Sequence, residues 1–325
     1  VKLAGADITV SDSVNKTEAT TIDGYHGGSG TVTLTTASGS STDLKALNDD
    51  TTISIAGSLL TLTGTVDEST VGTVNTYSTK TVTVSDITDN IANVKKIYDV
   101  KPAGAGQNGV DMSAADIILT DSVTDISTLD TTLTYTTGTV TLQTVNESKA
   151  DLAKLANAGG AYGDVKLAGA AITVSDAVNK TEADTIDGYH GGTGTVTIGE
   201  VTANAADLKL LHEDTTISIA GATINLSGAI TDKATIETVL GYTTGTVKIA
   251  TITEDKADLA SIASASGTFA KASLATANIT VSDSVNKTEA TTIDGYGSGT
   301  VTLTTASGSS TDLKALNDDT TISIA

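Results

Sequence analysis

The chain has 325 residues and a formal net charge of −21, because 39 acidic residues oppose 18 basic ones, all of which are lysine. This charge repels nucleic acid and anionic lipid, and the lack of arginine removes the usual fork for binding phosphate. No run of 18 apolar residues occurs either. We therefore expect no nucleic-acid partner and no membrane insertion.

The composition also restricts the kind of core that the chain can build. Cysteine and tryptophan are absent, and proline, methionine and phenylalanine occur once each, yet 38% of the residues are hydrophobic. Aliphatic residues in this proportion favour a thin, regularly layered core over disorder. We expect an ordered, elongated protein without disulfides.

The sequence repeats itself. The segment VKLAGADITVSDSVNKTEATTIDGYHGG at Val1 returns at Val165 with few changes, and LATANITVSDSVNKTEATTIDGY follows from Leu274. This periodicity predicts repeat blocks at residues 1–164 and 165–271, and a partial block at 272–325 that stops within the repeat. A chain that starts and stops inside its own repeat is expected to be a window of something longer.

Within each block the pattern predicts strand, helix, strand and helix in turn. In the first strand Ile8 and Val10 point inward while Thr9 points outward, and the same alternation recurs in residues 32–35 and 53–55. The first helix follows in SDSVNKTEATTIDGY, where we expect Ser11 or Asp12 to cap the N-terminus and Gly24 to take the left-handed position after the C-terminus.

The second helix carries the pattern DLxxL, in segments that begin at Thr42, Ala150, Ala206, Ala257 and Thr311. Leu44 and Leu47 share one face, and Asp43 lies in the first turn, where its charge favours the helix dipole.

About six such units follow from this pattern. They begin near Ile8, Ile53, Ile117, Ile172, Ile217 and Ile279, with second strands near Val32, Val82, Val140, Val196, Val247 and Val301. The segments between strands suit crossover helices, so neighbouring strands should be parallel. The predicted fold class is therefore α/β, a repeat solenoid of parallel β-strands alternating with short helices. The Gly/Ala-rich residues 99–115, 159–170 and 265–276 are expected to form loops that project from one edge.

The alternative fold is a string of tandem all-β sandwiches, which regular short strands also suggest. The DLxxL segments weigh against it because they contain strong helix formers with caps. The lack of tryptophan and of Asn-Gly hairpin signals weighs against it too.

In the segments ITVSD, TTIDGY, GTVTLTT and ADLKxL, the chain resembles the giant tandem-repeat cell-surface proteins of bacteria, the strand-repeat proteins. The resemblance implies an extracellular or cell-surface location and a non-enzymatic structural role as a self-assembling filament, sheath, surface layer or adhesin stalk. One branch of these proteins binds calcium through GGxGxD, but GYHGGSGT at Gly24 lacks the aspartate. The resemblance therefore does not carry calcium over to this chain.

Aspartate recurs at fixed places, and in a solenoid such places would form columns of carboxylates about 5 Å apart. Their repulsion favours a bound hard cation such as calcium. The other interpretation is that these residues are helix caps and turns. The candidate calcium ligands are Asp12, Asp23, Asp49, Asp50, Asp176, Asp187, Asp283, Asp294, Asp318 and Asp319.

The three histidines give little support for chemistry. His26 and His190 occupy the same place in GYHGG, but the third copy reads GYGSG, so we expect a solvated loop histidine there. No second histidine or cysteine lies at metal spacing near them or near His212. A carbohydrate-active solenoid enzyme would also need aromatic platforms that this composition lacks. We expect no catalytic site and no enzyme activity.

TVT triplets recur at Thr31, Thr81, Thr139, Thr195 and Thr300. On stacked parallel strands they would form a hydroxyl array like that of ice-binding solenoids, although strands such as TTISI and TVKIA interrupt the grid. This leaves an alternative function, an adhesin or an ice- or polysaccharide-binding rod that presents a Thr-rich strand face. The expected partners are the protein itself, in an end-to-end or lateral homopolymer, and surface polysaccharide.

Overall fold

The computed structural model describes residues 3–102, 104 and 107–325, which form two compact units. Unit 1 consists of residues 1–145 and 153–168, and unit 2 of residues 146–152 and 169–325. The division between them falls within strand β8 (Val140–Glu147) and helix α6 (Lys149–Leu155).

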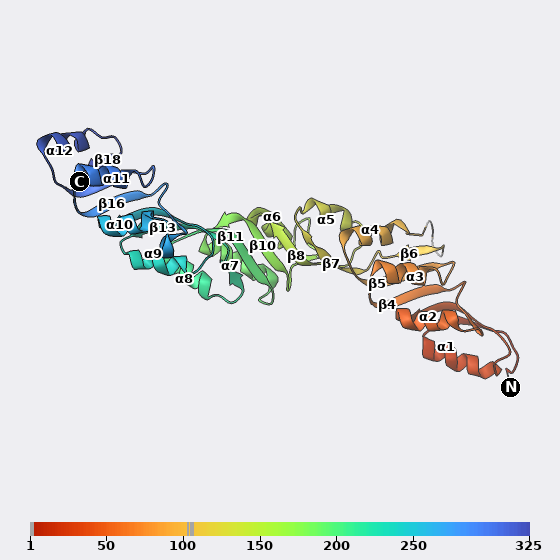
Figure 1. The fold of residues 1–325 in the computed structure, drawn as a ribbon. Helices are drawn as coiled ribbons and strands as arrows, with labels where there is room; N and C mark the ends of the chain where they lie inside the picture. The colour runs from red at the N-terminus through yellow and green to blue at the C-terminus, as the bar shows by residue number, and fades with distance from the viewer. Residues whose placement is uncertain (1–2, 103, 105–106) are drawn as a thin grey trace. The chain divides into compact units, whose positions relative to one another are not determined.

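In unit 1 long strands alternate with helices (Figure 1). The strands are β1 (Ile8–Val14), β2 (Val32–Gly39), β3 (Ile53–Ser54), β4 (Leu59–Val66), β5 (Thr81–Asp89), β6 (Gly109–Asp111), β7 (Asp116–Val123), most of β8, and β9 (Val165–Lys166). The helices are α1 (Lys16–Asp23), α2 (Ser41–Asp49), α3 (Glu68–Asn75), α4 (Ile91–Asp99) and α5 (Ser127–Thr132).

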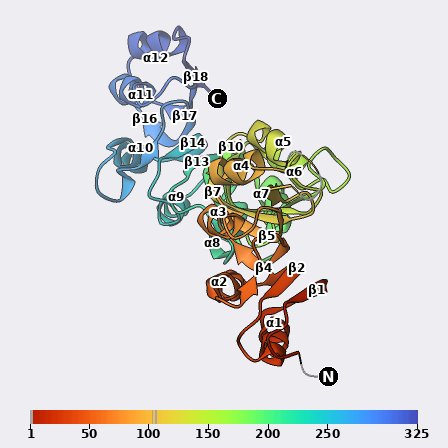
Figure 2. The same cartoon turned by 90° about the vertical axis from the view of Figure 1, so that its right-hand side faces the viewer.

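Unit 2 follows the same plan, which Figure 2 shows from a second side. Its strands are β10 (Ala171–Val178), β11 (Thr195–Ala203), β12 (Ile217–Ser218), β13 (Thr223–Ile230), β14 (Val247–Glu254), β15 (Ala272–Ser273), β16 (Asn278–Val285), β17 (Val301–Ala306) and β18 (Ile322–Ile324). Its helices are α7 (Lys180–Asp187), α8 (Ala205–Glu213), α9 (Lys233–Leu240), α10 (Lys256–Ala263), α11 (Lys287–Asp294) and α12 (Ser310–Asn317).

We call one long strand, the helix after it and the connection to the next strand a coil. The strand pairs of each unit are parallel, as β1 with β2 and β10 with β11. Val32 and Leu34 of β2 are buried with Leu44 and Leu47 of α2, whereas Thr33 is exposed. The α/β repeat solenoid of parallel strands and short helices is therefore confirmed, and the sandwich alternative is wrong.

The predicted end residues of the first helix are wrong. Strand β1 continues through Val14, so Asn15 is the N-cap: its side chain accepts from the Glu18 N–H, and the Glu18 carboxylate accepts from the Asn15 N–H. At the other end Gly24 keeps a right-handed φ of −59° and opens a 3₁₀ turn. The left-handed conformation falls on the next glycine along, Gly27, with φ +71°.

The sheet is staggered, which the repeat pattern did not predict. Strand β1 pairs with β2 from Val32 to Ala37, whereas β4 pairs with the second half of β2 alone, from Thr36. In unit 2 the second half of β11 likewise pairs with β13 from Glu200. Each pair of long strands is thus displaced from the preceding pair by about four residues, roughly 13 Å along the strand direction.

Short strands fill the steps that the stagger leaves. Ile53 and Ile217, predicted to begin new units, lie in the short strands β3 and β12, and the long strands begin later, at Leu59 and Thr223. The predicted loops at 99–115, 159–170 and 265–276 also contain strands of this kind, β6, β9 and β15, although residues 103, 105 and 106 lie outside the described residues. These segments are therefore partly built into the sheet, because the stagger leaves backbone N–H and C=O groups that need hydrogen-bond partners.

Candidate functional site: the contacts between coils

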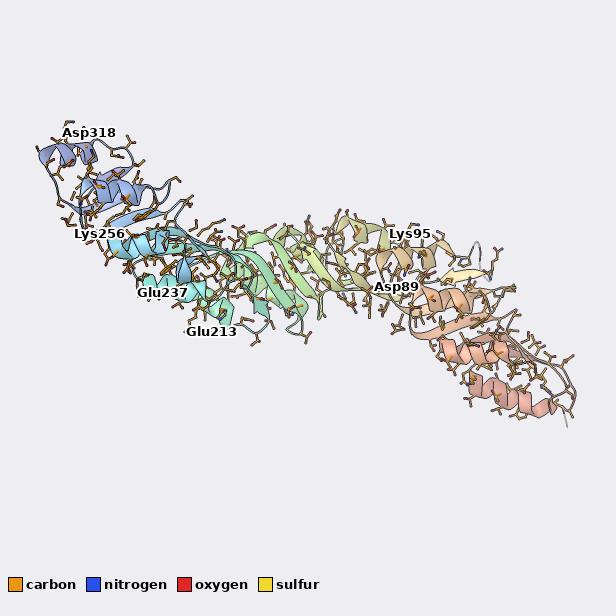
Figure 3. All side chains as sticks on the ribbon, viewed as in Figure 1. Asp89, Lys95, Glu213, Glu237, Lys256 and Asp318 are labelled. Carbon is orange, nitrogen blue, oxygen red and sulfur yellow. The ribbon has the colours of Figure 1, made fainter. Side chains whose placement is uncertain are left out.

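The recurring polar residues join each coil to the next, beginning with aspartates that cap a neighbouring helix. The carboxylate of Asp283 in β16 accepts from the backbone N–H of Lys256, the first residue of α10, at 3.0 Å. Asp121 of β7 accepts in the same way from Ile91 of α4. A helix N-terminus has free N–H groups and a positive dipole end, so a carboxylate from the next coil stabilises it. Lys256 is labelled in Figure 3.

A second set of contacts pairs lysines with acids across neighbouring helices. Lys256 Nζ lies 3.0 Å from Glu289, the third residue of α11, and Lys233 of α9 lies 2.5 Å from Asp258 of α10. Hydrogen bonds from the Asn286 N–H and from Lys256 hold the pKa of Glu289 below its usual value. These pairs are partly exposed, so solvent screens them and each contributes little to stability. Further members are Lys16 with Asp43 and Lys149 with Glu182.

Tyrosine follows every second helix, from α1 to α11, at Tyr25, Tyr77, Tyr135, Tyr189, Tyr242 and Tyr296. Two of these rings stack on the helix of the preceding coil. Tyr135 stacks on Tyr98 of α4 with ring centroids 4.1 Å apart, and Tyr242 stacks on His212 of α8 at 4.4 Å. Tyr135 and Tyr242 therefore serve contact between coils, and the fixed recurrence of tyrosine was the sequence signal for this role.

Glycines allow the coils to approach closely. A Cβ built on Gly30 would lie 2.1 Å from the carbonyl oxygen of Ala6, and one on Gly245 would lie 2.3 Å from that of Ala222. Only glycine fits against a backbone at this distance. The same contact recurs at Gly138, Gly194 and Gly299.

The prediction of solvated loop histidines is wrong, because His26 and His190 are fully buried. His190 Nδ1 accepts from the N–H groups of Gly192 and Gly194 at 3.1 Å, and its Nε2 lies 2.9 Å from Asp187. A ring nitrogen that accepts from backbone N–H carries no proton, so the imidazole is neutral and donates from Nε2 to the carboxylate.

Buried hydroxyls take this role where histidine is missing. The Thr243 hydroxyl accepts from the Gly245 N–H at 2.8 Å and donates to the Ala222 carbonyl at 2.6 Å. Thr136 bonds Gly138 and Ala115 in the same way. The histidines are therefore structural bridges, and their burial leaves them closed to a substrate.

The aspartates predicted as calcium ligands are placed in four kinds of contact. Asp23 and Asp187 bond the buried histidines, Asp49 and Asp318 pair with Lys45 and Lys314, Asp50 and Asp319 accept from threonine turns, and Asp176 and Asp283 cap helices. Within the described residues, the side chains of Asp12 and Asp294 make no hydrogen bond. No group of three or more His, Asp or Glu suited to a metal ion occurs in that part of the chain.

The threonine turns show why such carboxylates are occupied. Asp50 Oδ1 accepts from the N–H and the hydroxyl of Thr52, both at 2.8 Å, and from the Ile53 N–H at 3.1 Å. The hydrogen bonds from Thr52 hold the pKa of Asp50 below its usual value. Each such aspartate starts the connection into a short strand of the sheet.

The outward strand face carries hydroxyl rows that run across the strands, with Thr253, Thr280 and Thr302 half-buried and Ser323 exposed. In unit 2, Thr253, Thr280, Thr302 and Ser323 pair in one row, and Thr302 and Ser323 have their hydroxyl oxygens 3.2 Å apart. The stagger limits such rows to about four strands. Other rows contain charged residues, as where Lys248 stands between Asn225 and Ser273.

No known protein family matches the chain, and a search of curated proteins finds no significant relative. None of the helices in the described residues is long and apolar enough to cross a membrane.

Proposed function

We propose that this protein is a non-enzymatic structural protein of the cell exterior, a self-assembling filament, sheath or surface layer built by stacking coils. The observation that carries the proposal is that residues recurring at fixed positions are used to join coils. Asp283 caps α10, Lys256 pairs with Glu289, and Tyr242 stacks on His212. These acidic, basic and aromatic side chains, which could otherwise take part in catalysis, thus make contacts between coils.

A repeated interface of this kind is heterologous, since one side of a coil meets the opposite side of the next. Heterologous contacts do not close on themselves and so generate open-ended polymers. In repeat proteins each coil buries its apolar face only against its neighbours, so stability grows as coils are added. The resemblance to strand-repeat proteins of bacterial surfaces agrees with an extracellular site of assembly.

An alternative function is supported by the hydroxyl rows of the outward strand face. The row through Thr280 and Thr302 offers hydroxyl groups at the spacing of adjacent strands, about 4.8 Å, to a polysaccharide or to ice. An adhesin or binding rod would use this face while remaining a single particle.

Electron microscopy of the protein as isolated from its source separates the two functions. Ordered fibres or two-dimensional lattices are expected from the structural role. Isolated particles at high concentration that bind polysaccharide beads, and lose this binding in Thr280→Val and Thr302→Val variants, would overturn it in favour of the binding rod.

A further inference from the structure

The tyrosine that follows every second helix is covered by a ring in some places and left open in others. We call the contact of α2, α4, α6, α8 or α10 with the helix after it a junction. In the α4/α5 junction Tyr98 stacks on Tyr135, and in the α8/α9 junction His212 stacks on Tyr242. Tyr98 and His212 occupy the same position, directly after the second buried apolar residue of their helices. The chain thus supplies a flat ring to these two tyrosines.

In the other three junctions a small or polar residue stands at this position. It is Asn48 in α2, Ala156 directly after α6 and Ala263 in α10. The tyrosines of these junctions are Tyr77, Tyr189 and Tyr296. Beside them lie grooves with volumes of about 260, 210 and 210 Å³, which we call the open grooves. The first lies within unit 1, and the residues that line the other two belong to unit 2.

The open grooves are lined by hydroxyl groups at matching places. A threonine lies four residues before each tyrosine, and a threonine or serine lies eight residues before it. These pairs are Thr73 and Ser69, Thr185 and Thr181, and Thr292 and Thr288. In each groove the hydroxyl of the nearer threonine donates to the backbone carbonyl of the farther residue, at 2.8–2.9 Å. Its oxygen therefore faces a ligand as an acceptor.

A lysine and a glutamate form the polar rim of the two grooves in unit 2. Lys256 Nζ lies 3.0 Å from Glu289 and donates to the Ser284 carbonyl at 3.1 Å. Lys149 Nζ lies 2.8 Å from Glu182 in the same way. A lysine ammonium has three donors, so a third is left for a ligand within the part of the chain described. The two opposite charges leave the rim neutral.

This combination suits a sugar ring. The C–H face of a pyranose is apolar and packs on the face of a tyrosine, whose π-electrons attract it. The hydroxyls at the edge of the sugar donate to threonine oxygens and accept from lysine, whereas a hydrocarbon ring would leave those groups unused. Drug-sized ligands fill pockets of about 300–1,000 Å³, so the smaller open grooves suit a single ring. The net charge of −21 favours a neutral sugar over an acidic one.

We propose that the open grooves bind neutral pyranose units of a polysaccharide, one ring on each tyrosine. The stacked rings of Tyr98 and His212, at centroid distances of 4.1 and 4.4 Å from their tyrosines, show how such a ring lies. The site is formed by helices, whereas the hydroxyl rows of the alternative function lie on the outward strand face. The inference goes beyond the proposed structural role and does not depend on polymer formation.

Chemical modification of tyrosine tests the proposal residue by residue. The 325-residue chain is iodinated with and without cellotetraose, maltotetraose or chitotetraose, and mass spectrometry locates each modified ring. We expect at least one saccharide to protect Tyr77, Tyr189 and Tyr296, with modification about threefold lower at a concentration of about twice the Kd. Tyr162 lies outside the grooves, where its hydroxyl bonds Asp130, and should be modified as before.

Filling the grooves should abolish binding. The triple variant Asn48→Tyr, Ala156→Tyr and Ala263→Tyr places a ring where Tyr98 stands in α4. Saturation-transfer NMR signals of the saccharide should then be lost, while thermal unfolding shows that the variant is folded. Leu210→Tyr is the control, because it adds a ring at a 53% exposed site of α8, and it should leave binding unchanged.

Opening a covered junction should create a site. Tyr98→Ala uncovers Tyr135, which is 6% exposed in the native chain. Ser127 and Thr131 lie eight and four residues before Tyr135, as in the open grooves. We expect Tyr135 to become open to iodination and to be protected by the same saccharide. A site gained in this way cannot arise from loss of folding.

Three outcomes would overturn the inference. Equal modification of the three groove tyrosines with and without every saccharide would show that no sugar enters the grooves. Saccharide binding that survives the triple variant and is lost in Thr280→Val and Thr302→Val variants would place it on the strand face. Protection that rises with protein concentration alone would assign the grooves to a second copy of the chain. Fibres or lattices bear on the structural role only, so the two proposals fail separately.

Discussion

Gly194 lies against the carbonyl of Ala170 so closely that a Cβ on Gly194 would sit 2.0 Å from that oxygen. We expect Gly194→Ala to lower the free energy of unfolding by about 3 kcal/mol, because backbone must move to admit the methyl group. Urea unfolding measures this. Gly188→Ala is the matched control: Gly188 has φ −60° and no atom within 4 Å of its Cβ position, so stability should stay the same or rise by up to about 1 kcal/mol. Equal losses in both variants would show that the close contact is not formed.

Removal of a buried imidazole should be costly. His190→Ala leaves the Gly192 and Gly194 N–H groups and Asp187 without their partner and opens a cavity, so we expect a loss of about 2–4 kcal/mol. His212→Ala is the control, because that ring is exposed and the contact seen for it in the described part of the chain is stacking on Tyr242, with an expected loss of at most about 1.5 kcal/mol. Chemical denaturation of both variants measures the loss in the free energy of unfolding. A smaller loss for His190→Ala than for His212→Ala would contradict the bridging role.

The cross-coil helix caps predict a local effect. Asp121→Ala removes the acceptor of the Ile91 N–H and should cost about 1 kcal/mol. Hydrogen exchange should locate the loss at the start of α4. Asp12→Ala changes the corresponding residue of β1, which caps no helix of the part of the chain described, and should be neutral in this 325-residue chain. Unchanged exchange at Ile91 in the Asp121 variant would refute the capping.

Glu254 gives a prediction with a definite sign in pH. Burial raises the pKa of this carboxyl above its usual value, and among the described residues its Oε1 has no hydrogen-bond partner. Its ionisation therefore costs stability as the pH rises through the raised pKa, whereas below the unfolded value no cost exists. Glu254→Gln should raise the melting temperature at pH 7 and leave it unchanged near pH 3.5. Glu213→Gln, at an exposed site, should leave the melting temperature unchanged at both pH values. A drop in melting temperature at pH 7 for Glu254→Gln would contradict the assigned cost.

Calcium should leave the stability unchanged. The carboxylates of Asp50, Asp187 and Asp283 accept from Thr52, His190 and Lys256 and are satisfied without an ion. Thermal unfolding with a chelator and with added calcium should give one midpoint. A midpoint of thermal unfolding that rises with calcium would show that the aspartates do bind the ion.

The sequence by itself determined the fold class and most of the long strands and helices. Alternation in Ile8–Val10 and the DLxxL spacing around Leu44 are local patterns, and they suffice because strands and short helices follow hydrophobic periodicity. The second helix at Ile91–Asp99 was missed because valine and isoleucine, Val94 and Ile97, stand in place of the leucines. Repetition then predicted stacking.

Only the tertiary structure decided which residues meet. The partners of Lys256 in the next coil, Asp283 and Glu289, lie 27 and 33 residues further along the chain, so no local period encodes these pairs. The stagger arises where the chain leaves β3 and enters the sheet again at Leu59 of β4, opposite Thr36 of β2. Turn geometry sets the register of such strands. His190 looked like a loop residue because its burial depends on glycines that let a neighbouring coil close over it. These contacts depend on how coils stack, and the stacking depends on how closely the backbones of neighbouring coils can approach each other.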